Sequence, residues 1–353
     1  MISKLVLKNF RCFHDISLDG IRPVTLFAGA NSVGKSTLLE GLFLFYDRYT
    51  SSVFLKLNNF RGIPRIDFSP VMVWEQLFFN RDTSKNITIT VQNERGLQTA
   101  VISKDSSFSF SSISDNSMPR NGQAVIRHDY YPLKLEYNDS ANNDDAHFYI
   151  SESGIVFQSK KRVTTEVPCV HYYSSRVSIT TAEAADMLGK VVIAGNKPRC
   201  IEILRMLDEQ IEDLFVVLHG AIPVIYVERG SARKEPVSSL GDGINKLLHI
   251  ALLMLANPKS VVLVDELENG FHYSFFPKLW EIIGRITTET GCQVLATTHS
   301  YECINGAVAL AEDTTTPELF RFIRIDSNDG KRTPHVFDND SFEYAVKSEW
   351  EVR

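Results

Sequence analysis

The sequence has no long apolar run, and this absence argues against a membrane-spanning helix. Hydrophobic residues make up 44% of the 353 positions, but no apolar stretch approaches the ~18 consecutive residues that a span requires. The first residues, Met1 to Leu5, follow a strand-like pattern and lack the charged-then-apolar order of a secretory signal. We therefore expect a cytoplasmic globular protein with a sizeable core.

Paired cysteines and a strong net charge are also missing. The five cysteines are scattered and never form a C-x-x-C pair, so neither a structural zinc site nor a disulfide framework is expected, and a reducing compartment fits. The formal net charge of −6 argues against a chain that coats nucleic acid non-specifically, although it leaves a local basic groove open. Nucleic-acid binding therefore has no support from the net charge.

The most informative segment that is present is a complete phosphate-binding loop at residues 29–37. Gly29 and Gly34 stand where the G-x-x-x-x-G-K-[ST] pattern needs glycine, because backbone N–H groups must converge on a phosphate. Lys35 is expected to reach the β- and γ-phosphates, and the Ser36 hydroxyl to bind Mg²⁺. The predicted nucleotide-binding residues of this loop are Gly29, Ala30, Asn31, Ser32, Val33, Gly34, Lys35, Ser36 and Thr37.

The sequence on either side of the loop supports this interpretation. Residues 24–28 are β-branched and apolar, which predicts a buried strand, and residues 36–46 predict a helix that opens at the loop. The N-terminal dipole of that helix then lies under the phosphates. A glycine-rich turn without a ligand is the alternative, but the order of strand, loop and helix favours a bound nucleotide. ATP is favoured over GTP because the sequence has no Asn-Lys-x-Asp motif.

Two acidic residues end a second apolar strand, at residues 260–266. A strand buried on both faces ends where it meets a ligand crevice, so its last side chains point at the site. Asp265 is expected to hold Mg²⁺, and Glu266 to polarise the attacking water. The alternative interpretation is a strand end with two solvated acids that have no functional role. This alternative is less favoured because a nucleotide site with a phosphate loop also requires an acidic residue from elsewhere in the chain.

A loop of small residues at 238–246 precedes this strand and leads into a predicted helix over residues 247–255. Such a loop at a helix N-terminus is a second candidate anion site. A helix start with Asp242 as the N-cap is the alternative interpretation. The loop comes about 20 residues before the acidic strand, so phosphate loop, insertion, glycine loop with helix and acidic strand follow in the order of ABC ATPases.

The rest of the chain predicts one domain over residues 1–353 with four parts. Residues 1–50 predict an N-terminal β unit with the phosphate loop, and residues 85–170 predict an inserted antiparallel sheet with polar loops. Residues 178–220 predict a helical subdomain, and residues 221–353 carry the glycine loop, the acidic strand and a C-terminal α/β part. The helical prediction extends over residues 180–219 and depends on an apolar stripe at three- and four-residue spacing. That stripe is Ile201, Leu204, Leu207, Ile211, Leu214 and Leu218.

Five segments together make the chain resemble the AAA15/AAA21-type ATPases, ABC-class proteins related to the ATPase half of the overcoming-lysogenization-defect (OLD) nucleases. The chain is also similar, more distantly, to chromosome-structuring and repair ATPases. The final residues, 350–353, resemble the usual ending of the family. The resemblance implies an α/β fold: an ABC-type P-loop ATPase head with an N-terminal β subdomain, an inserted antiparallel β region and a helical subdomain. The five segments are residues 9–13, 29–37, 240–246, 264–272 and 296–300.

The resemblance also implies roles for residues outside the phosphate loop. Arg11 is the family position that braces the nucleotide side of the N-terminal sheet, although a surface arginine is an alternative interpretation. His299 follows another apolar strand and corresponds to the switch histidine that senses the γ-phosphate; a purely structural histidine is the alternative. Glu268 is implied as an acid behind the site, and residues 269–272 as a dimer-contact loop. Gln76 is a candidate for the Mg²⁺-sensing glutamine.

The glycine loop departs from the family pattern at one position. In ABC ATPases this loop closes on the nucleotide held by the other subunit, which implies nucleotide contacts from Leu240, Gly241, Asp242 and Gly243. The ABC signature is Leu-Ser-Gly-Gly, and Gly241 stands where the phosphate-contacting serine would be. Backbone N–H groups, Ser239 or Asn245 are the candidates to replace that serine.

The leading functional prediction is an ATPase that uses ATP and Mg²⁺, forms a homodimer around two ATP molecules and hydrolyses them slowly as a switch. Higher oligomers are left open. The family implies a sensor ATPase in a bacterial anti-phage or toxin-like system, acting with a separately encoded, nuclease-like effector.

Two other functions remain as alternatives. The chain could itself be a nuclease, but only 53 residues follow Ser300, and Asp326, Asp329, Asp338 and Asp340 are predicted to lie in loops. A DNA-repair or DNA-tethering ATPase related to the SMC proteins would call for a basic groove or long coiled-coil arms, and the sequence predicts neither. The trigger and the partner do not follow from the sequence.

Overall fold

A computed structural model describes residues 1–63, 73–105, 131–140, 143–151, 154–159, 168–174, 179–230, 233–313 and 315–348. The chain divides into two compact units. Unit 1 consists of Met1–Ile21, Ser32–Val167 and Asp326–Pro334, and unit 2 of Arg22–Asn31, Pro168–Ile325 and His335–Arg353. The chain crosses from unit 2 to unit 1 inside the phosphate loop, after Asn31.

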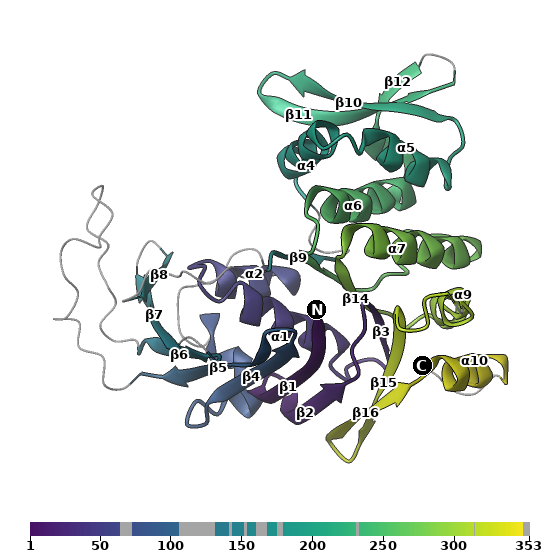
Figure 1. Cartoon of the computed structure of the whole chain (residues 1–353). Coiled ribbons are helices and arrows are strands. Elements are labelled where there is room, and N and C mark those ends of the chain that lie inside the picture. The colour runs from purple at the N-terminus through teal and green to yellow at the C-terminus, as the bar shows by residue number, and fades with distance from the viewer. Residues whose placement is uncertain are drawn as a thin grey trace. The chain divides into compact units, whose positions relative to one another are not determined.

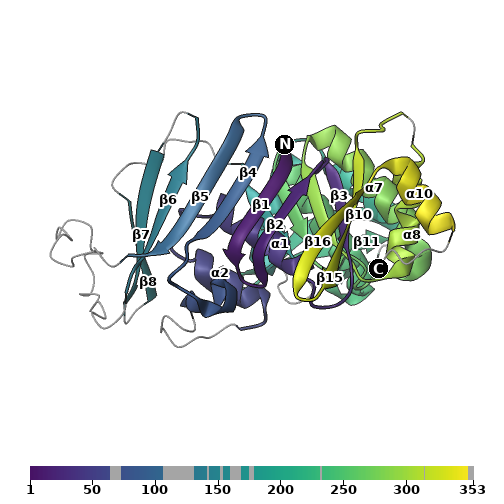
Figure 2. The same ribbon diagram turned by 90° about the horizontal axis from the view of Figure 1, so that it is seen from below.

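Unit 1 contains a seven-stranded antiparallel sheet in the order β2-β1-β4-β5-β6-β7-β8 (Figure 2). The predicted antiparallel region after residue 85 is confirmed, but it is continuous with the N-terminal strands because β4 pairs with β1, with Leu5 opposite Val91. Residues 106–130 of the region expected to form this sheet and the ending at 350–353 lie outside the described residues. The strands are β1 (Ile2–Phe10), β2 (Phe13–Asp19), β4 (Ile87–Asn93), β5 (Gly96–Lys104), β6 (Leu133–Asn138), β7 (Asn143–Ser151) and β8 (Gly154–Ser159).

Helix α1 (Lys35–Tyr46) packs on this sheet and carries the second half of the phosphate loop. A Cβ built on Gly41 would lie 2.8 Å from Cδ2 of Leu7, so a glycine is needed where the helix approaches β1. Ten of the twelve α1 residues are buried, which fixes the start of the helix firmly in unit 1. The other helical segments of this unit are α2 (Val53–Phe60), η1 (Glu75–Leu77) and η2 (Phe79–Arg81).

A second sheet, in the order β16-β15-β3-β14-β13-β9, forms the centre of unit 2, except that the hairpin segment Asp326–Pro334 of β15 and β16 is assigned to unit 1. Strands β15, β3, β14, β13 and β9 are parallel, and β3, β13 and β14 are buried along their whole length, as expected when both faces are covered. The carboxyl ends of parallel strands meet at one edge, so β3, β13 and β14 all deliver their following loops there. The strands are β3 (Val24–Ala28), β9 (Val170–Tyr173), β13 (Val261–Val264), β14 (Gln293–Thr297), β15 (Phe320–Asn328) and β16 (Lys331–Phe337).

A second, three-stranded sheet in unit 2 is covered on one face by helices α4 and α5 (Figure 1). Its strands are β10 (Ile211–His219), β11 (Ile222–Arg229) and β12 (Arg233–Pro236). The helical segments of unit 2 are α4 (Thr181–Ile193), α5 (Lys197–Arg205), η5 (Val237–Leu240), α6 (Asp242–Ala256), η6 (Tyr273–Phe275), α7 (Phe276–Thr290), α8 (Tyr301–Gly306), α9 (Val308–Ala311) and α10 (Asn339–Lys347). In the described part of the chain, no helix is long and apolar enough to cross a membrane.

The helix predicted over residues 180–219 is wrong beyond Arg205, because residues 211–219 form strand β10. The apolar stripe satisfied a helical period by chance, and its last member, Leu218, is 67% exposed. Strand β10 pairs with β11 through a tight connection at Gly220, whose φ is 65°. The β-branched and aromatic run at residues 215–217 was the signal for a strand.

One alternative interpretation and one smaller prediction are also wrong. Asp242 is the first residue of α6 rather than its N-cap; the N-cap is Gly241, with φ 101° and ψ 165°, a backbone conformation that glycine adopts most easily. Asp326 lies in β15 and Asp340 in α10, not in loops, because β15 pairs with β3 and the Asp338 side chain caps the start of α10.

Candidate functional site

The phosphate loop has glycine at two positions where its backbone conformation favours that residue. A Cβ built on Gly34 would lie 2.5 Å from Cζ of Phe13 and 2.7 Å from Sγ of Cys12, and the φ of Gly34 is 109°. Gly29, with φ 138°, likewise has a conformation that suits glycine. Helix α1 begins at Lys35 without a side-chain cap, so its N-terminus has the arrangement that suits a bound phosphate.

Arg11 belongs to a buried ionic network behind this helix and is not a surface arginine. Its Nε lies 2.6 Å from Oε2 of Glu40, and both side chains are almost completely buried. Arg61 approaches the same carboxylate with its Nε 2.7 Å from Oε1, and its Nη2 donates to Oγ1 of Thr37 at 3.3 Å. Arg11 therefore braces α1 through Glu40, while its contact with a nucleotide stays a prediction.

Gln76 lies in η1, where its amide donates a hydrogen bond to Oδ1 of Asn58. Its role as the Mg²⁺-sensing residue stays a prediction. Within the described residues, no group of three or more His, Cys, Asp and Glu side chains is arranged to hold a metal ion by itself. The predicted Mg²⁺ ligands Ser36 and Asp265 lie in different units of the chain, and their joint role stays a prediction.

Asp265 is fixed at the end of β13 by hydroxyl groups from the two neighbouring strands. The Thr297 hydroxyl, on β14, donates to Oδ1 at 2.6 Å, and the Tyr172 hydroxyl, on β9, donates to Oδ2 at 3.0 Å. The carboxylate is 9% exposed. Neutral donors orient a carboxylate and leave its charge available, so the donor set at Asp265 fits a Mg²⁺ ligand.

Glu266 follows in a sharp turn that the same threonine stabilises. Its φ is 52°, which is unusual for a residue other than glycine and is typical of functional turns. The Glu266 N–H donates to Oγ1 of Thr297 at 2.9 Å, and Nδ2 of Asn269 donates to Oε2 of Glu266 at 2.7 Å. Thr297 thus links Asp265 to Glu266, and Asn269 orients the Glu266 carboxylate.

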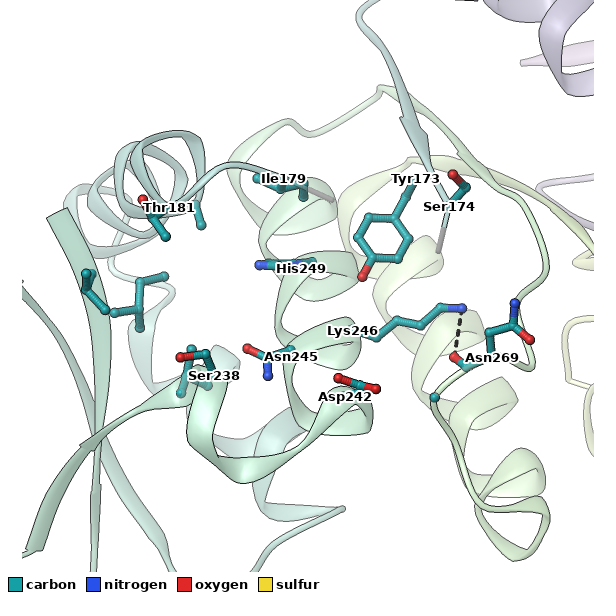
Figure 3. Close-up of a pocket in the computed structure, with 15 residues that line it drawn as sticks. Tyr173, Ser174, Ile179, Thr181, Ser238, Asp242, Asn245, Lys246, His249 and Asn269 are labelled. Atoms are coloured by element: carbon teal, nitrogen blue, oxygen red, sulfur yellow. Dashed lines mark hydrogen bonds between the residues drawn. The ribbon is translucent and has the colours of Figure 1, made fainter. Parts of the chain in front are cut away.

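Lys246 has a role in this loop that the sequence did not reveal. Its Nζ donates to the carbonyl oxygen of Glu266 at 2.9 Å and to that of Asn269 at 3.0 Å, the second of which is drawn in Figure 3. The side chain is buried, and this burial lowers the pKa of Lys246 to about 8, although nearby carboxylates, Glu268 first, partly offset the effect. Lys246 therefore ties helix α6 to the acidic loop of its own chain; no sequence spacing indicates this contact.

His299 is oriented by Glu268. The His299 N–H donates to Oε1 of Glu268 at 3.0 Å, and Nδ1 of the ring lies 2.8 Å from the same oxygen. Glu268 is buried, whereas the imidazole is about half exposed. A carboxylate on Nδ1 fixes the ring orientation and directs Nε2 away from it. The implied role of Glu268 behind the site agrees with this contact, and the role of His299 stays a prediction.

The glycine loop is constrained by its own chain. A Cβ built on Gly243 would lie 2.8 Å from the carbonyl oxygen of Gly270, so glycine is required where α6 meets the acidic loop. Nδ2 of Asn245 donates to the carbonyl oxygen of Gly241 at 2.9 Å. Ser239 is exposed. The nucleotide contacts of Leu240, Gly241, Asp242 and Gly243 stay predictions.

The comparison with protein families identifies the chain. A family model described as "AAA domain, putative AbiEii toxin, Type IV TA system" matches residues 72–305, more than half of the sequence. The chain belongs to this family. The matched segment contains the glycine loop, the acidic loop and His299, and it begins after the phosphate loop.

Relatives and solved structures agree with that family. The chain is 22% identical over 380 residues to an "ATP/GTP phosphatase" of Helicobacter pylori, covering 99% of both proteins. It is 37% identical over 91 residues to an "OLD nuclease" of Thermus scotoductus, covering 26% of this chain and 14% of that protein. An Smc head bound to the C-winged helix domain of ScpA shares the fold at 12% identity, with a TM-score of 0.52 over 98% of this chain and 99% of that one.

A second solved structure supports the same fold. An Smc head domain with an extended coiled coil, bound to the C-terminal domain of ScpA and derived from Pyrococcus furiosus, has a TM-score of 0.51 at 10% identity, covering 99% of both chains. The predicted fold class and the predicted resemblance to AAA21- and OLD-type ATPases are confirmed. The protein is an ABC-type P-loop ATPase, an enzyme that hydrolyses ATP.

Proposed function

We propose that this ATPase works as a dimer that encloses two ATP molecules, each held by the phosphate loop of one chain and the glycine loop of the other. The observation that carries the proposal is the rigid acidic loop, in which the Thr297 hydroxyl connects Asp265 to Glu266 and Lys246 connects the loop to α6. The glycine loop forms the start of α6. When this loop closes on a nucleotide, its movement is therefore transmitted through α6 and Lys246 to Glu266.

The phosphate loop and the acidic loop divide the chemistry between them. Lys35 and the backbone N–H groups of the phosphate loop would hold the β- and γ-phosphates. Ser36 and Asp265 would hold Mg²⁺, which would neutralise charge on the phosphate oxygens. The Glu266 carboxylate accepts a proton from a water that attacks the γ-phosphorus. The bond from that phosphorus to the bridging oxygen breaks, and ADP and inorganic phosphate leave. Nε2 of His299 is directed outward to steady the γ-phosphate.

The cellular role that fits best is a cytoplasmic sensor in an anti-phage or toxin-like system. The family description names a putative toxin of a toxin–antitoxin system, and the partial relative is an OLD nuclease. None of the five cysteines, all of which the structure describes, forms a disulfide, which agrees with a reducing compartment. A separately encoded, nuclease-like effector is the partner in this proposal. The likeness to Smc heads is one of fold and leaves a DNA-tethering role as the second candidate.

Complementation between two inactive variants tests the two-chain site. Lys35→Ala removes the main charge on the phosphates and should abolish ATP binding. Asp242→Arg places a bulky cation at the exposed start of α6 and should block closure while ATP binding to the separate chain remains. A mixture contains dimers with one intact phosphate loop facing one intact glycine loop. The expected result is recovered ATP hydrolysis in the mixture, at up to about a quarter of the wild-type rate, since half the dimers are mixed and each has one site of two.

Glu281→Arg, an exposed charge reversal on α7, is the matched control for Asp242→Arg and should hydrolyse ATP as the wild type does. A mixture that stays inactive although both variants fold, and although ATP-dependent dimers form, contradicts the two-chain site.

A further inference from the structure

Unit 2 contains a cavity of about 450 Å³ behind the start of α6 (Figure 3). Its walls come from α4, strand β11, α6, the end of β9 and the turn at Asn269 and Gly270. That volume lies in the range of sites for small molecules. The predicted phosphate loop contributes no residue to the lining.

One wall of the cavity is aromatic and the opposite wall is aliphatic. The rings of Tyr173 and His249 lie 5.8 Å apart with an interplanar angle of 60°. Ala184, Val224 and Ile225 line the side formed by α4 and β11. A flat ring placed between such walls gains both apolar burial and aromatic contact.

His249 contributes a neutral imidazole ring to the wall of this cavity. Burial lowers the pKa of His249 to about 4, so the imidazole is neutral at pH 7. Its Nδ1 is buried and has no hydrogen-bond partner among the described residues. Since Nδ1 is closed off from the cavity, a ligand there contacts the exposed part of the imidazole ring.

The charged groups disfavour an anionic ligand. Lys246 is the cationic side chain among the lining residues, and two backbone carbonyls already accept from its Nζ. Asp242 contributes a carboxylate, and Ser238 and Asn245 contribute a hydroxyl and an amide on the same side. These groups match hydroxyls and amides rather than phosphate oxygens.

We propose that the cavity binds an uncharged aromatic heterocycle that carries hydroxyl groups and has the size of a nucleoside. The ring lies against Tyr173 and His249, and the hydroxyl groups face Asp242, Ser238 and Asn245. The cavity shares α6 and Asn269 with the acidic loop, so an occupant changes the rate of ATP hydrolysis; this second statement rests on the proposed function. The site therefore serves as an effector site separate from the phosphate loop.

Binding is measured on a chain that cannot hold ATP through its phosphate loop. Lys35→Ala is titrated separately with adenosine, guanosine, cytidine and uridine, up to about 1 mM, by equilibrium dialysis. At least one nucleoside should bind with a Kd below that concentration. Thr181→Phe, which adds a ring at the cavity wall on α4, should weaken this binding about tenfold or more. Ala182→Phe, the adjacent exposed position, is the matched control and should not change it.

A second variant tests the polar contact separately from the available space. His249→Phe keeps a ring against Tyr173 and removes both ring nitrogens, so it should also weaken binding, by about tenfold. Circular dichroism on all variants verifies that each is folded.

Each outcome decides one statement. The absence of binding by all four nucleosides overturns the site, as does binding that Thr181→Phe and His249→Phe leave unchanged. Tighter binding of the 5′-monophosphates than of the nucleosides overturns the uncharged ligand. In the chain with Lys35 intact, an ATPase rate that does not respond to a bound nucleoside overturns the effector role alone. Failure of the ATPase or the two-chain site leaves these binding results unaffected.

Discussion

Two polar networks lie beside the two halves of the predicted ATP site, and they use different chemistry. In unit 1, Glu40 is shared by the guanidinium groups of Arg11 and Arg61, so buried charges face each other directly. In unit 2, Asp265 is held by neutral hydroxyl groups, and the Lys246 ammonium donates to backbone carbonyls rather than to a carboxylate.

The difference agrees with the roles that we propose for the two halves. Two guanidiniums around one carboxylate leave a positive excess behind α1, which suits a helix that receives phosphate. Hydroxyl and backbone contacts orient the acidic loop without neutralising its carboxylates, which suits acids that hold Mg²⁺ and accept a proton. The unit 1 network therefore serves mainly stability and charge, and the unit 2 network mainly orientation.

The largest expected effect is on ATP turnover, and it comes from removing the carboxylate charge of Glu266, which the unit 2 network orients. Glu266→Gln keeps the side-chain shape and the phosphate-binding half, so ATP should still bind, while turnover should fall about a thousandfold because the proton acceptor is lost. The variant should accumulate as an ATP-bound dimer in size-exclusion chromatography. Glu281→Gln, on the exposed side of α7, is the control. If Glu266→Gln hydrolyses ATP at the wild-type rate, Glu266 is not the proton acceptor. The proposed difference between the two networks then loses its main support.

The next effect should be on stability, in the unit 1 network. Glu40→Gln leaves the Arg11 and Arg61 guanidiniums without their carboxylate, and a buried ion pair broken on one side costs about 3 kcal/mol. Chemical denaturation should show that loss in the free energy of unfolding, whereas Glu266→Gln should unfold close to the wild type. Equal stability losses in the two variants would contradict the division between a stabilising and an orienting network.

Much of this arrangement could be predicted from the sequence, because it depends on short-range patterns. The phosphate loop, the buried strands before it and before Asp265, and the position of His299 after β14 all follow from apolar runs that end in chemical side chains. Contacts between distant residues could not be predicted. The helix predicted from the apolar stripe through Leu218 is wrong because pairing with β11 decides the structure of this segment. The spacing of apolar residues along one segment contains no information about a partner strand.

The contacts of Arg11 and Lys246 show the same limit at the level of single side chains. Arg11 is buried because Glu40 and Arg61 come together from other segments, so a surface arginine was an equally valid interpretation of the sequence. Lys246 was part of a loop expected to contact the other subunit, but its ammonium points into its own chain. Only the folded backbone brings the carbonyls of Glu266 and Asn269 to one donor.

The smallest expected effect separates orientation from charge within unit 2. Lys246→Met fills the same apolar path but donates no hydrogen bonds, so the acidic loop should lose its tie to α6 and ATP turnover should fall about tenfold, with ATP binding retained. Lys278→Met, an exposed position on α7, is the matched control. If Lys246→Met loses ATP binding as well as turnover, Lys246 supports the structure in general and does not act specifically on the acidic loop.

The pH dependence of stability gives Lys246 a second, independent readout. Burial lowers the pKa of Lys246 to about 8 in the folded chain, against an ordinary value of 10.5. Between these two pH values the unfolded chain binds more protons at this residue than the folded chain does, so the free energy of unfolding should rise with pH across that window. Lys246→Met should remove this rise, and Lys278→Met should keep it. If the slope is the same in both variants, the ammonium is solvated in solution, and the tie between α6 and the acidic loop loses its support.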